Sequence, residues 1–253
     1  MRSTRANRFP IRDVIVAYLI SILVAEYLLL FVLPFAGIIL HSALVLTLVI
    51  WASTFAEESH SRALHTLSII PVLRLLATMS PLQNLSPVTQ ELVLSIGLLT
   101  VALIYLNIHN MSLADIGLKR DFSLTQLSIG LTGIPMGVLM GIIAPQTLQA
   151  NAILPILLIF FTVLIEAILF HGILLDSMVT NMGRFAGVMF AAIYYVVLFS
   201  SFSFEIVVIL FTMNVMYGVA KLKTGNLSGI IVAQSIARIT FVFLMPILLS
   251  LYF

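Results

Sequence analysis

Long apolar runs fill most of this chain, and they constrain its fold more than any other feature. A helix that crosses the hydrocarbon core of a bilayer needs about 20 mainly apolar residues. Its backbone must also satisfy its own hydrogen bonds there, which favours helices over other structures. The sequence therefore predicts an all-α fold, a polytopic transmembrane helix bundle of eight or nine spans. The candidate spans are Val14–Leu33, Gly37–Trp51, Ala63–Met79, Val88–Ile108, Leu124–Ile143, Ala152–Leu175, Phe185–Phe199, Ile206–Ala220 and Leu227–Leu251.

The composition excludes several other classes of protein. Charged residues make up 9% of the chain and apolar residues 61%, whereas a soluble domain carries roughly a quarter charged residues. The chain has no cysteine, so disulfides, thiolate metal sites and a cysteine nucleophile are excluded. The formal net charge is only +2, and no basic block interleaved with aromatic residues suggests a nucleic acid partner.

The arginines before the first apolar run resemble the charged start of a signal peptide. The run that follows is too long for one, contains Glu26 and lacks a clear cleavage site. We therefore interpret it as an uncleaved first span. The arginines in question are Arg2, Arg5, Arg8 and Arg12.

The loop charges predict an orientation in the membrane. When nine spans are threaded from a cytoplasmic N-terminus, the basic loop residues fall on the inner side, as the positive-inside rule requires. These residues are Arg62, Lys119, Arg120, Arg184, Lys221 and Lys223. The outer connections around Gln83–Gln90, Pro145–Asn151 and Ser200–Glu205 contain no Lys or Arg. We expect an integral protein of a prokaryotic plasma membrane with its C-terminus outside.

The third candidate span, Ala63–Met79, is the weakest of the nine. It contains His65, Pro71 and Arg74, so it is expected to be tilted, broken or re-entrant. A re-entrant segment would flip every later loop, and the charge pattern therefore favours a segment that crosses.

Ionisable residues inside the spans are costly, and function is the default hypothesis for them. Glu166 and Gln234 lie at similar depth, roughly 15 Å from the inner ends of their spans at 1.5 Å per residue. Arg238 shares a helix face with Gln234. We predict a buried polar site in which Glu166 and Arg238 form an ion pair and Gln234 is a second hydrogen-bonding partner. For the other such residues, internal pairing that stabilises helix packing is expected: Glu26, His41, His65, Arg74, His171 and Asn214.

Gly133, Gly137 and Gly141 recur at every fourth residue of the fifth candidate span. Small residues on one helix face allow two helices to approach closely. The series predicts either a dimer seam or, as we prefer, helix packing within this bundle.

Three segments resemble one family of intramembrane proteases. E-A-I-L-F-H-G, from Glu166, resembles E-E-x-x-x-R-G, the first motif of the CAAX prenyl protease and bacteriocin-processing (CPBP, or Abi) family. L-A-D-I-G-L-K-R, from Leu113, and K-T-G-N-L-S-G-I-I-V-A-Q, from Lys223, resemble the family's inner-loop segment and the approach to its last catalytic histidine. The resemblance implies a helical core over residues 111–253, with a conical cavity open to the cytoplasmic leaflet. Residues 1–110 would add N-terminal transmembrane helices to the same membrane unit.

The catalytic positions of the family are mostly changed in this chain. The resemblance carries the first glutamate to Glu166, which is kept. The changed positions are Ala167 for the second glutamate, His171 for the motif arginine, Phe199 for the histidine of F-x-x-x-H, Gln234 for the last histidine and Arg238 for the asparagine. An alternative register, Phe190 to Tyr194, also supplies no histidine. No catalytic residue, cofactor or metal site is therefore expected.

Two classes of function remain. The first is a non-catalytic family member that acts as a scaffold, regulator or accessory subunit and binds a membrane protein or a lipidated peptide among the membrane lipids. The alternative is an active endopeptidase with a diverged site, for example one using Glu166 and His171, although these residues are about 140° apart on an ideal helix. A third hypothesis is a proton or ion path through Glu26, Arg74, Glu166 and Arg238.

Overall fold

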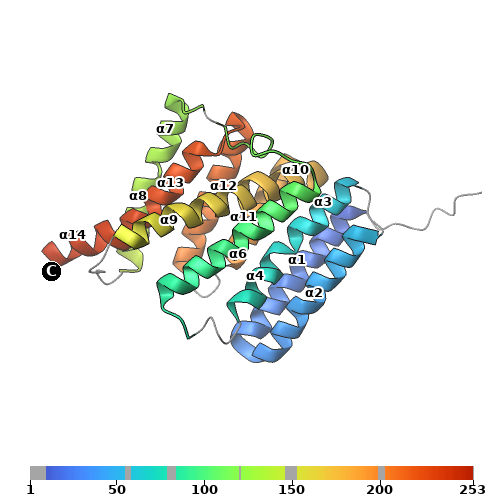
Figure 1. Cartoon of the computed structure of the whole chain (residues 1–253). Coiled ribbons are helices and arrows are strands. Elements are labelled where there is room, and N and C mark those ends of the chain that lie inside the picture. Colours follow the sequence, from blue (N-terminus) through green and yellow to red (C-terminus); the bar gives the residue numbers. More distant parts are fainter. Residues whose placement is uncertain are drawn as a thin grey trace, which may run out of the picture.

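The computed structural model describes residues 10–54, 58–78, 84–119, 121–145, 153–198 and 203–252, and every regular element in these ranges is a helix (Figure 1). The elements are α1 (Ile11–Tyr27), η1 (Leu28–Val32), α2 (Pro34–Thr54), α3 (Glu58–Leu67), α4 (Ile69–Ala77), α6 (Pro87–Ile108), α7 (Leu124–Leu131), α8 (Gly133–Ile143), α9 (Ile153–Glu166), η2 (Ala167–Leu174), α10 (Leu175–Met182), α11 (Arg184–Val197), α12 (Phe204–Thr224), α13 (Ser228–Ile239), η3 (Thr240–Leu244) and α14 (Met245–Tyr252).

The prediction of an all-helical transmembrane bundle is confirmed. Seven helical stretches among the described residues are long and apolar enough to cross a membrane. The apolar helix α11 is shorter and corresponds to the seventh predicted span. The pair α3–α4 corresponds to the third predicted span. The seven stretches are Ile11–Val32, Pro34–Thr54, Val88–Ile108, Leu124–Ile143, Leu154–Met182, Phe204–Thr224 and Ser228–Leu248.

Some predicted ends are wrong. The sixth predicted span was expected to end at Leu175, but its helix continues through Met182, so Asp176 belongs to a helix and not to a loop. Its carboxylate forms an ion pair with Lys221 of α12, and this pairing lets a charged residue remain within the bundle.

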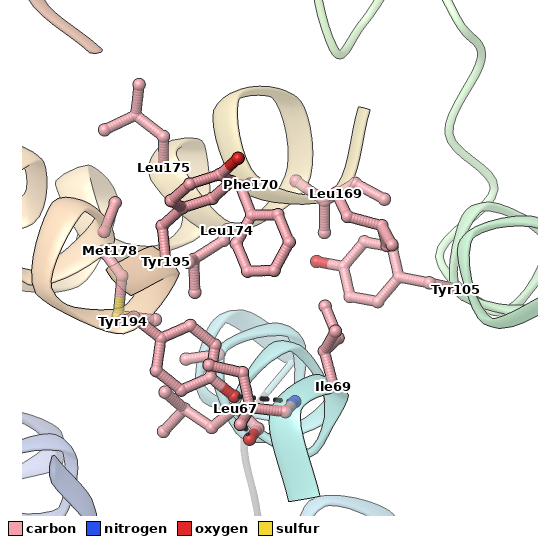
Figure 2. Close-up of a cluster of buried hydrophobic side chains, with 14 of the residues drawn as sticks. Leu67, Ile69, Tyr105, Leu169, Phe170, Leu174, Leu175, Met178, Tyr194 and Tyr195 are labelled. Carbon is pink, nitrogen blue, oxygen red and sulfur yellow. Dashed lines mark hydrogen bonds between the residues drawn. The ribbon is translucent and has the colours of Figure 1, made fainter. Parts of the chain in front are cut away.

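The third predicted span is broken between α3 and α4, and Pro71 explains the break. Proline has no N–H to donate to the carbonyl four residues earlier, and its ring clashes with that group. The carbonyl in question belongs to Leu67, and it accepts hydrogen bonds from the hydroxyls of Tyr18 and Tyr194 instead. Tyr194 also accepts a hydrogen bond of 3.2 Å from the backbone N–H of Ile70. Figure 2 shows Tyr194 reaching this break from a cluster of buried side chains.

Three membrane helices contain a π-helical stretch next to a charged residue. Segment η1 begins two residues after Glu26, η2 directly follows Glu166, and η3 begins two residues after Arg238. A π-helical turn uses i→i+5 hydrogen bonds, and such turns are frequent at functional sites. Pro246 follows η3 and supplies no N–H of its own, which fits a locally rearranged hydrogen-bond ladder.

The stretch α9–η2–α10 is the most buried of the seven candidate spans, and it runs through the middle of the bundle (Figure 1). Helices α1 to α4 lie on one side of it, and α7, α8, α13 and α14 lie on the other. Helix α10 contacts α3 and α11, and α9 contacts α6 and α13. This central stretch therefore brings together elements from both halves of the chain.

The glycine series of α8 packs against α13, η3 and α14 of the same chain. A Cβ at Gly133 would collide with the carbonyl oxygen of Ala233. A Cβ at Gly137 would lie 2.5 Å from the carbonyl oxygen of Ala237 and 2.6 Å from the Cβ of Thr240. Gly141 would meet the side chain of Met245 in the same way. The glycines thus allow close approach within the bundle, and this face is not open to a dimer partner.

Candidate polar site in the membrane core

Glu166, Arg238 and Tyr195 form a triangle of hydrogen bonds in which Glu166 and Tyr195 are buried and the Arg238 side chain is 23% exposed. The guanidinium of Arg238 donates Nη2–H to Oε2 of Glu166 in an ion pair and contacts the Tyr195 hydroxyl at 3.1 Å. The Tyr195 hydroxyl donates to the same Oε2 at 3.0 Å. Glu166 is 7% exposed and Tyr195 is 2% exposed. We call these three residues the core triangle.

Three different helices position the core triangle. Glu166 ends α9, Tyr195 lies on α11, and Arg238 lies near the end of α13. The glycine face of α8 allows α13 to sit close to it, and α13 also contacts α9 directly. The helices therefore set the separation of the charged groups, and no loop is needed to hold them.

The core triangle restricts what Glu166 can do chemically. A general base needs a lone pair aimed at the proton it removes. Oε2 of Glu166 already accepts two hydrogen bonds, one of them from a cation. A charge-assisted bond of this kind is about twice as strong as a neutral one, so the carboxylate is directed at Arg238 and not at a water molecule.

The other residues that the resemblance predicts at changed catalytic positions do not join the core triangle. Ala167 is fully buried and has no polar atom in its side chain. Gln234 is 4% exposed, and its Oε1 has no hydrogen-bond partner in the described part of the chain. The expected hydrogen bond from Gln234 to the ion pair is thus not observed, and Tyr195 occupies that role. Phe199 lies outside the described residues.

His171 has different neighbours from Glu166. Its ring packs edge-on against Tyr217 of α12, with centroids 6.2 Å apart, and its Nδ1 has no hydrogen-bond partner within the described ranges. The angle of about 140° assumed an ideal α-helix, and this assumption was wrong because residues 167–174 are π-helical. The two side chains nevertheless contact different helices.

A second buried ion pair lies among the N-terminal helices. Nε of Arg74 donates to Oε1 of Glu26 at 2.6 Å, and Nε2 of His41 lies 3.6 Å from the same oxygen. Arg74 Nη2 also donates to the backbone carbonyls of Val197 and Leu198, at 2.8 and 3.3 Å. We call Glu26, His41 and Arg74 the N-terminal cluster. It shows the expected internal pairing for Glu26 and Arg74, whereas both ring nitrogens of His41 lack a hydrogen-bond partner in the described part of the chain.

Two further residues of the predicted set have local partners. His65 Nδ1 lies 3.3 Å from Nε2 of His109, the residue that follows α6. Asn214 donates to the carbonyl of Leu210 in its own helix. Within the described residues, no three His, Asp or Glu side chains are grouped closely enough to hold a metal ion.

Sequence reasoning missed three polar partners. Tyr195 stands at the aromatic position of F-x-x-x-H in the register that ends at Phe199 and was given no other role. His109 lies just outside the predicted span Val88–Ile108, and Asp176 was not matched with Lys221. Nothing in the sequence spacing connects these residues to their partners, since the contacts join helices far apart along the chain. The cue that was present for Tyr195 is its buried aromatic ring with a hydroxyl, which normally finds a hydrogen-bond partner.

The two loop segments of the resemblance dock on each other. The backbone N–H of Leu227 donates to the carbonyl of Gly117 at 2.8 Å, and the side chain of Asn226 donates to the carbonyl of Asp121. Ile116 is fully buried, and its Cβ would lie 3.1 Å from a Cβ at Gly172 in η2. The first of these loops thus packs against η2 of the central stretch.

Asp115 stabilises the turn within the first of these loops. The hydroxyl and the backbone N–H of Ser112 both donate to its carboxylate at 2.7 Å. These hydrogen bonds hold the pKa of the exposed Asp115 carboxyl below its usual range. The charge therefore fixes a loop turn and has no contact with the core triangle.

Comparison with known proteins identifies one family. Residues 147–240 match the family model described as type II CAAX prenyl endopeptidase Rce1-like. This region includes Glu166, Tyr195 and Arg238, so the whole core triangle lies inside it. No curated protein and no solved structure matches the chain.

Proposed function

The chain belongs to the CAAX-protease family through its Rce1-like region, and we propose that it is a non-catalytic member of that family. In this proposal the chain binds a membrane protein or a lipidated peptide and acts as a scaffold, regulator or accessory subunit. The observation that carries the proposal is the core triangle. In it, Arg238 and Tyr195 both donate hydrogen bonds to Oε2 of Glu166, the one retained glutamate that the resemblance identifies as catalytic.

The changed neighbours of Glu166 support the same proposal. Hydrolysis of a peptide bond requires a base that activates water and donors aimed at the developing oxyanion. Ala167 offers neither group. Gln234 can donate a hydrogen bond, but it does not exchange a proton at neutral pH. Arg238 is always charged and is a donor only, so it pairs with the carboxylate of Glu166 and cannot accept a proton.

A peptidase assay tests the absence of catalysis. The purified full chain, in mild detergent or nanodiscs, is incubated with a farnesylated CAAX peptide, and the release of the C-terminal tripeptide is followed by mass spectrometry. We expect no release above that of a Glu166→Gln variant. Turnover by the unchanged chain that disappears in Glu166→Gln would overturn the proposal.

A partner experiment tests the binding role. The full chain is isolated from native membranes in mild detergent, and the stoichiometry of any co-purifying protein is measured. We expect a membrane protein near one-to-one stoichiometry, retained by the Glu166→Gln variant because binding does not need the carboxylate as a base. A chain that runs as a lone monomer and that fails to bind the farnesylated peptide would contradict this role.

The alternative function is an active intramembrane endopeptidase with a diverged site. The retention of Glu166 within the region matched by the family model favours it. The two functions predict opposite results in the peptidase assay. In an active enzyme, the Arg238–Glu166 pair would have to open to admit water, so the turnover should increase in an Arg238→Asn variant.

We further propose that the protein lies in a prokaryotic plasma membrane with its N-terminus in the cytoplasm and its C-terminus outside. The support is that Lys119, in the loop after α6, and Lys221, in the last turn of α12, lie at the same end of the bundle, near Gly225 and Gly117 respectively. A cysteine introduced in place of Lys119 should resist an impermeant thiol reagent in intact cells. Labelling of that cysteine from outside would refute the orientation.

A further inference from the structure

Segment η2 links the core triangle to a second ion pair within the central stretch. Glu166 directly precedes η2 and pairs with Arg238 of α13. Asp176 follows η2 by two residues and pairs with Lys221 of α12. We call Asp176 and Lys221 the α10–α12 ion pair. The π-helical stretch is therefore held at both ends by charged partners on two different helices.

The π-helical geometry of η2 sets the angle between the two carboxylates around the helix axis. Asp176 lies ten residues after Glu166, and in an uninterrupted α-helix the two side chains would project about 80° apart at 3.6 residues per turn. The i→i+5 hydrogen bonds of η2 give more residues per turn, so Asp176 is rotated to a different angle. With the neighbouring helices fixed, a regular α-helix would not direct both carboxylates at their present partners.

Two neighbouring side chains of η2 contact the helices that carry the two ion pairs. The ring of Phe170 packs edge-on against Tyr195 of the core triangle, with centroids 5.1 Å apart. His171, the next residue, packs against Tyr217 of α12 with centroids 6.2 Å apart. Tyr217 and Lys221 are four residues apart and share a face of α12. All four rings are buried, so a rotation of η2 disturbs both contacts, because a close-packed interior transmits strain.

The α10–α12 ion pair is the more exposed end of this connection. The side chain of Asp176 is 33% exposed, whereas that of Glu166 is 9% exposed. Asp176 also lines a cavity of about 310 Å³ between α3, α6 and α10, close to the end of the candidate span that stops at Met182. The α10–α12 ion pair can therefore be disturbed without any group entering the core of the bundle.

We propose that η2 is a two-state segment that couples the α10–α12 ion pair to the core triangle. While both ion pairs are formed, η2 is π-helical and Phe170 packs against Tyr195. When the α10–α12 ion pair is broken, η2 relaxes to the α-helix, which is the far commoner form, and Phe170 rotates away from Tyr195. The hydroxyl of Tyr195 then binds Glu166 less firmly.

Such a switch lets a contact at the exposed end of the central stretch act on the buried end. Packed helices change between discrete arrangements, and shifts of about 1–2 Å at helix contacts are a recognised form of this change. The inference goes beyond the proposed function, because it does not depend on what the chain binds or on whether Glu166 is catalytic.

A double-mutant cycle on the full chain in detergent tests the coupling through the thermal midpoint Tm. Glu166 and Asp176 are roughly 15 Å apart along the helix axis at 1.5 Å per residue, and the effects of changes more than about 7–10 Å apart normally add. Tyr195→Phe should lower the Tm by up to about 2–4 °C. In a Lys221→Met background the same change should lower the Tm by about half as much or less, because Tyr195 has already lost part of its contact with Glu166.

Two lysine variants at the same end of α12 are the controls. Lys221→Arg keeps the ion pair with Asp176, and Lys223→Met removes an exposed lysine of the last turn. In both backgrounds Tyr195→Phe should lower the Tm as much as it does in the unchanged chain. If Lys221→Met gives no folded protein, Asp176→Asn/Lys221→Met replaces it, because that variant removes both charges and leaves neither buried without a partner.

Hydrogen exchange followed by mass spectrometry gives a second measurement on the same variants. In Lys221→Met, the amides of η2 and those of α11 around Tyr195 should exchange several-fold faster than in the unchanged chain. The amides of α2 should not change, because a local segment opens without unfolding the whole bundle.

Each outcome decides the proposal. A smaller Tyr195→Phe loss of Tm in the Lys221→Met background, with faster exchange around Tyr195, supports a switch in η2. An equal or larger loss would overturn it. Faster exchange that is confined to α10 and α12 would also overturn it, because the disturbance would then stop before it reaches the core triangle.

Discussion

The core triangle and the N-terminal cluster use the same chemistry in two regions of the molecule. Each pairs a buried glutamate with an arginine from another helix, and in each the helix of the glutamate continues as a π-helical stretch. The arginines differ in their other partners. Arg74 also binds two backbone carbonyls, whereas Arg238 also contacts the side-chain hydroxyl of Tyr195.

This difference assigns different roles to the two pairs. The last carbonyls of a helix have no intrahelical donor, and Val197 and Leu198 stand at the end of α11. Arg74 of α4 therefore caps the C-terminal end of α11 and also pairs with Glu26 of α1. Arg238 instead shields the carboxylate of Glu166, the residue that the motif resemblance predicts at a catalytic position. A buried ion pair between membrane helices therefore does not by itself identify a functional site. The additional partners of the arginine, backbone carbonyls for Arg74 and a side-chain hydroxyl for Arg238, distinguish the two roles.

The largest loss is expected from Arg74→Met. This change leaves Glu26 buried without its cation and also leaves two carbonyls without a donor. Breaking a buried pair by removing one partner costs roughly 3–5 kcal/mol in soluble proteins, and we expect the upper part of that range here. The yield of monodisperse protein and the Tm in detergent are the measurements.

The double variant Glu26→Gln/Arg74→Met is the matched control. It removes the stranded charge but leaves the carbonyls of Val197 and Leu198 unsatisfied, so the Tm should recover only in part. A full recovery of the Tm would show that the hydrogen bonds from Arg74 to the end of α11 do not contribute to stability.

A somewhat smaller loss is expected from Arg238→Met, near the lower end of roughly 3–5 kcal/mol. The Tyr195 hydroxyl still donates to Glu166 and partly compensates the stranded carboxylate. Adding Glu166→Gln should restore more of the Tm than the corresponding double variant does in the N-terminal cluster. Strictly additive losses of the two single changes would contradict a coupled pair.

Replacing the glycines at the close helix contacts beside the two ion pairs should lower the stability by an intermediate amount. Gly37 packs against the backbone of Leu29 in η1, where a Cβ would lie 2.6 Å away, and Gly137 packs against Ala237 and Thr240. Ala at either position should cost roughly 1–3 kcal/mol, as overpacking does. Gly97→Ala is the control, because its Cβ would meet only the flexible end of Leu76, at 3.2 Å. Equal Tm values for all three variants would contradict the close approaches.

The smallest effect is expected from Tyr195→Phe. It removes one hydroxyl that donates to a carboxylate, and a hydrogen bond of this kind contributes roughly 1.5–3 kcal/mol, less where another donor remains. Arg238 remains, so we expect about 1 kcal/mol or less. Tyr194→Phe is the comparison from the other region, since it leaves the N–H of Ile70 without its partner at the α3–α4 break. It should lower the Tm more than Tyr195→Phe, and the reverse order would contradict these roles.

The sequence was informative about the membrane fold because hydrophobicity acts locally. Each candidate span is recognised from its own residues, and the need to satisfy the backbone within the segment leaves the helix as the default. The break in the third span was also foreseeable, since Pro71 removes a donor wherever it stands in a helix. The π-helical stretches were not foreseeable, because they are decided by the packing of the whole bundle.

For the candidate site too, the sequence supplied one part of the answer and the tertiary structure supplied the other. The sequence by itself determined that Glu166 and Arg238 lie at similar depth and need partners, since depth follows from residue counts and the cost of a buried charge is general. Only the tertiary structure decided that Tyr195, and not Gln234, completes the core triangle, and that Glu26 pairs with Arg74. The rotation of each helix about its axis selects these partners, and that rotation is set by close packing against neighbours such as the glycine face of α8.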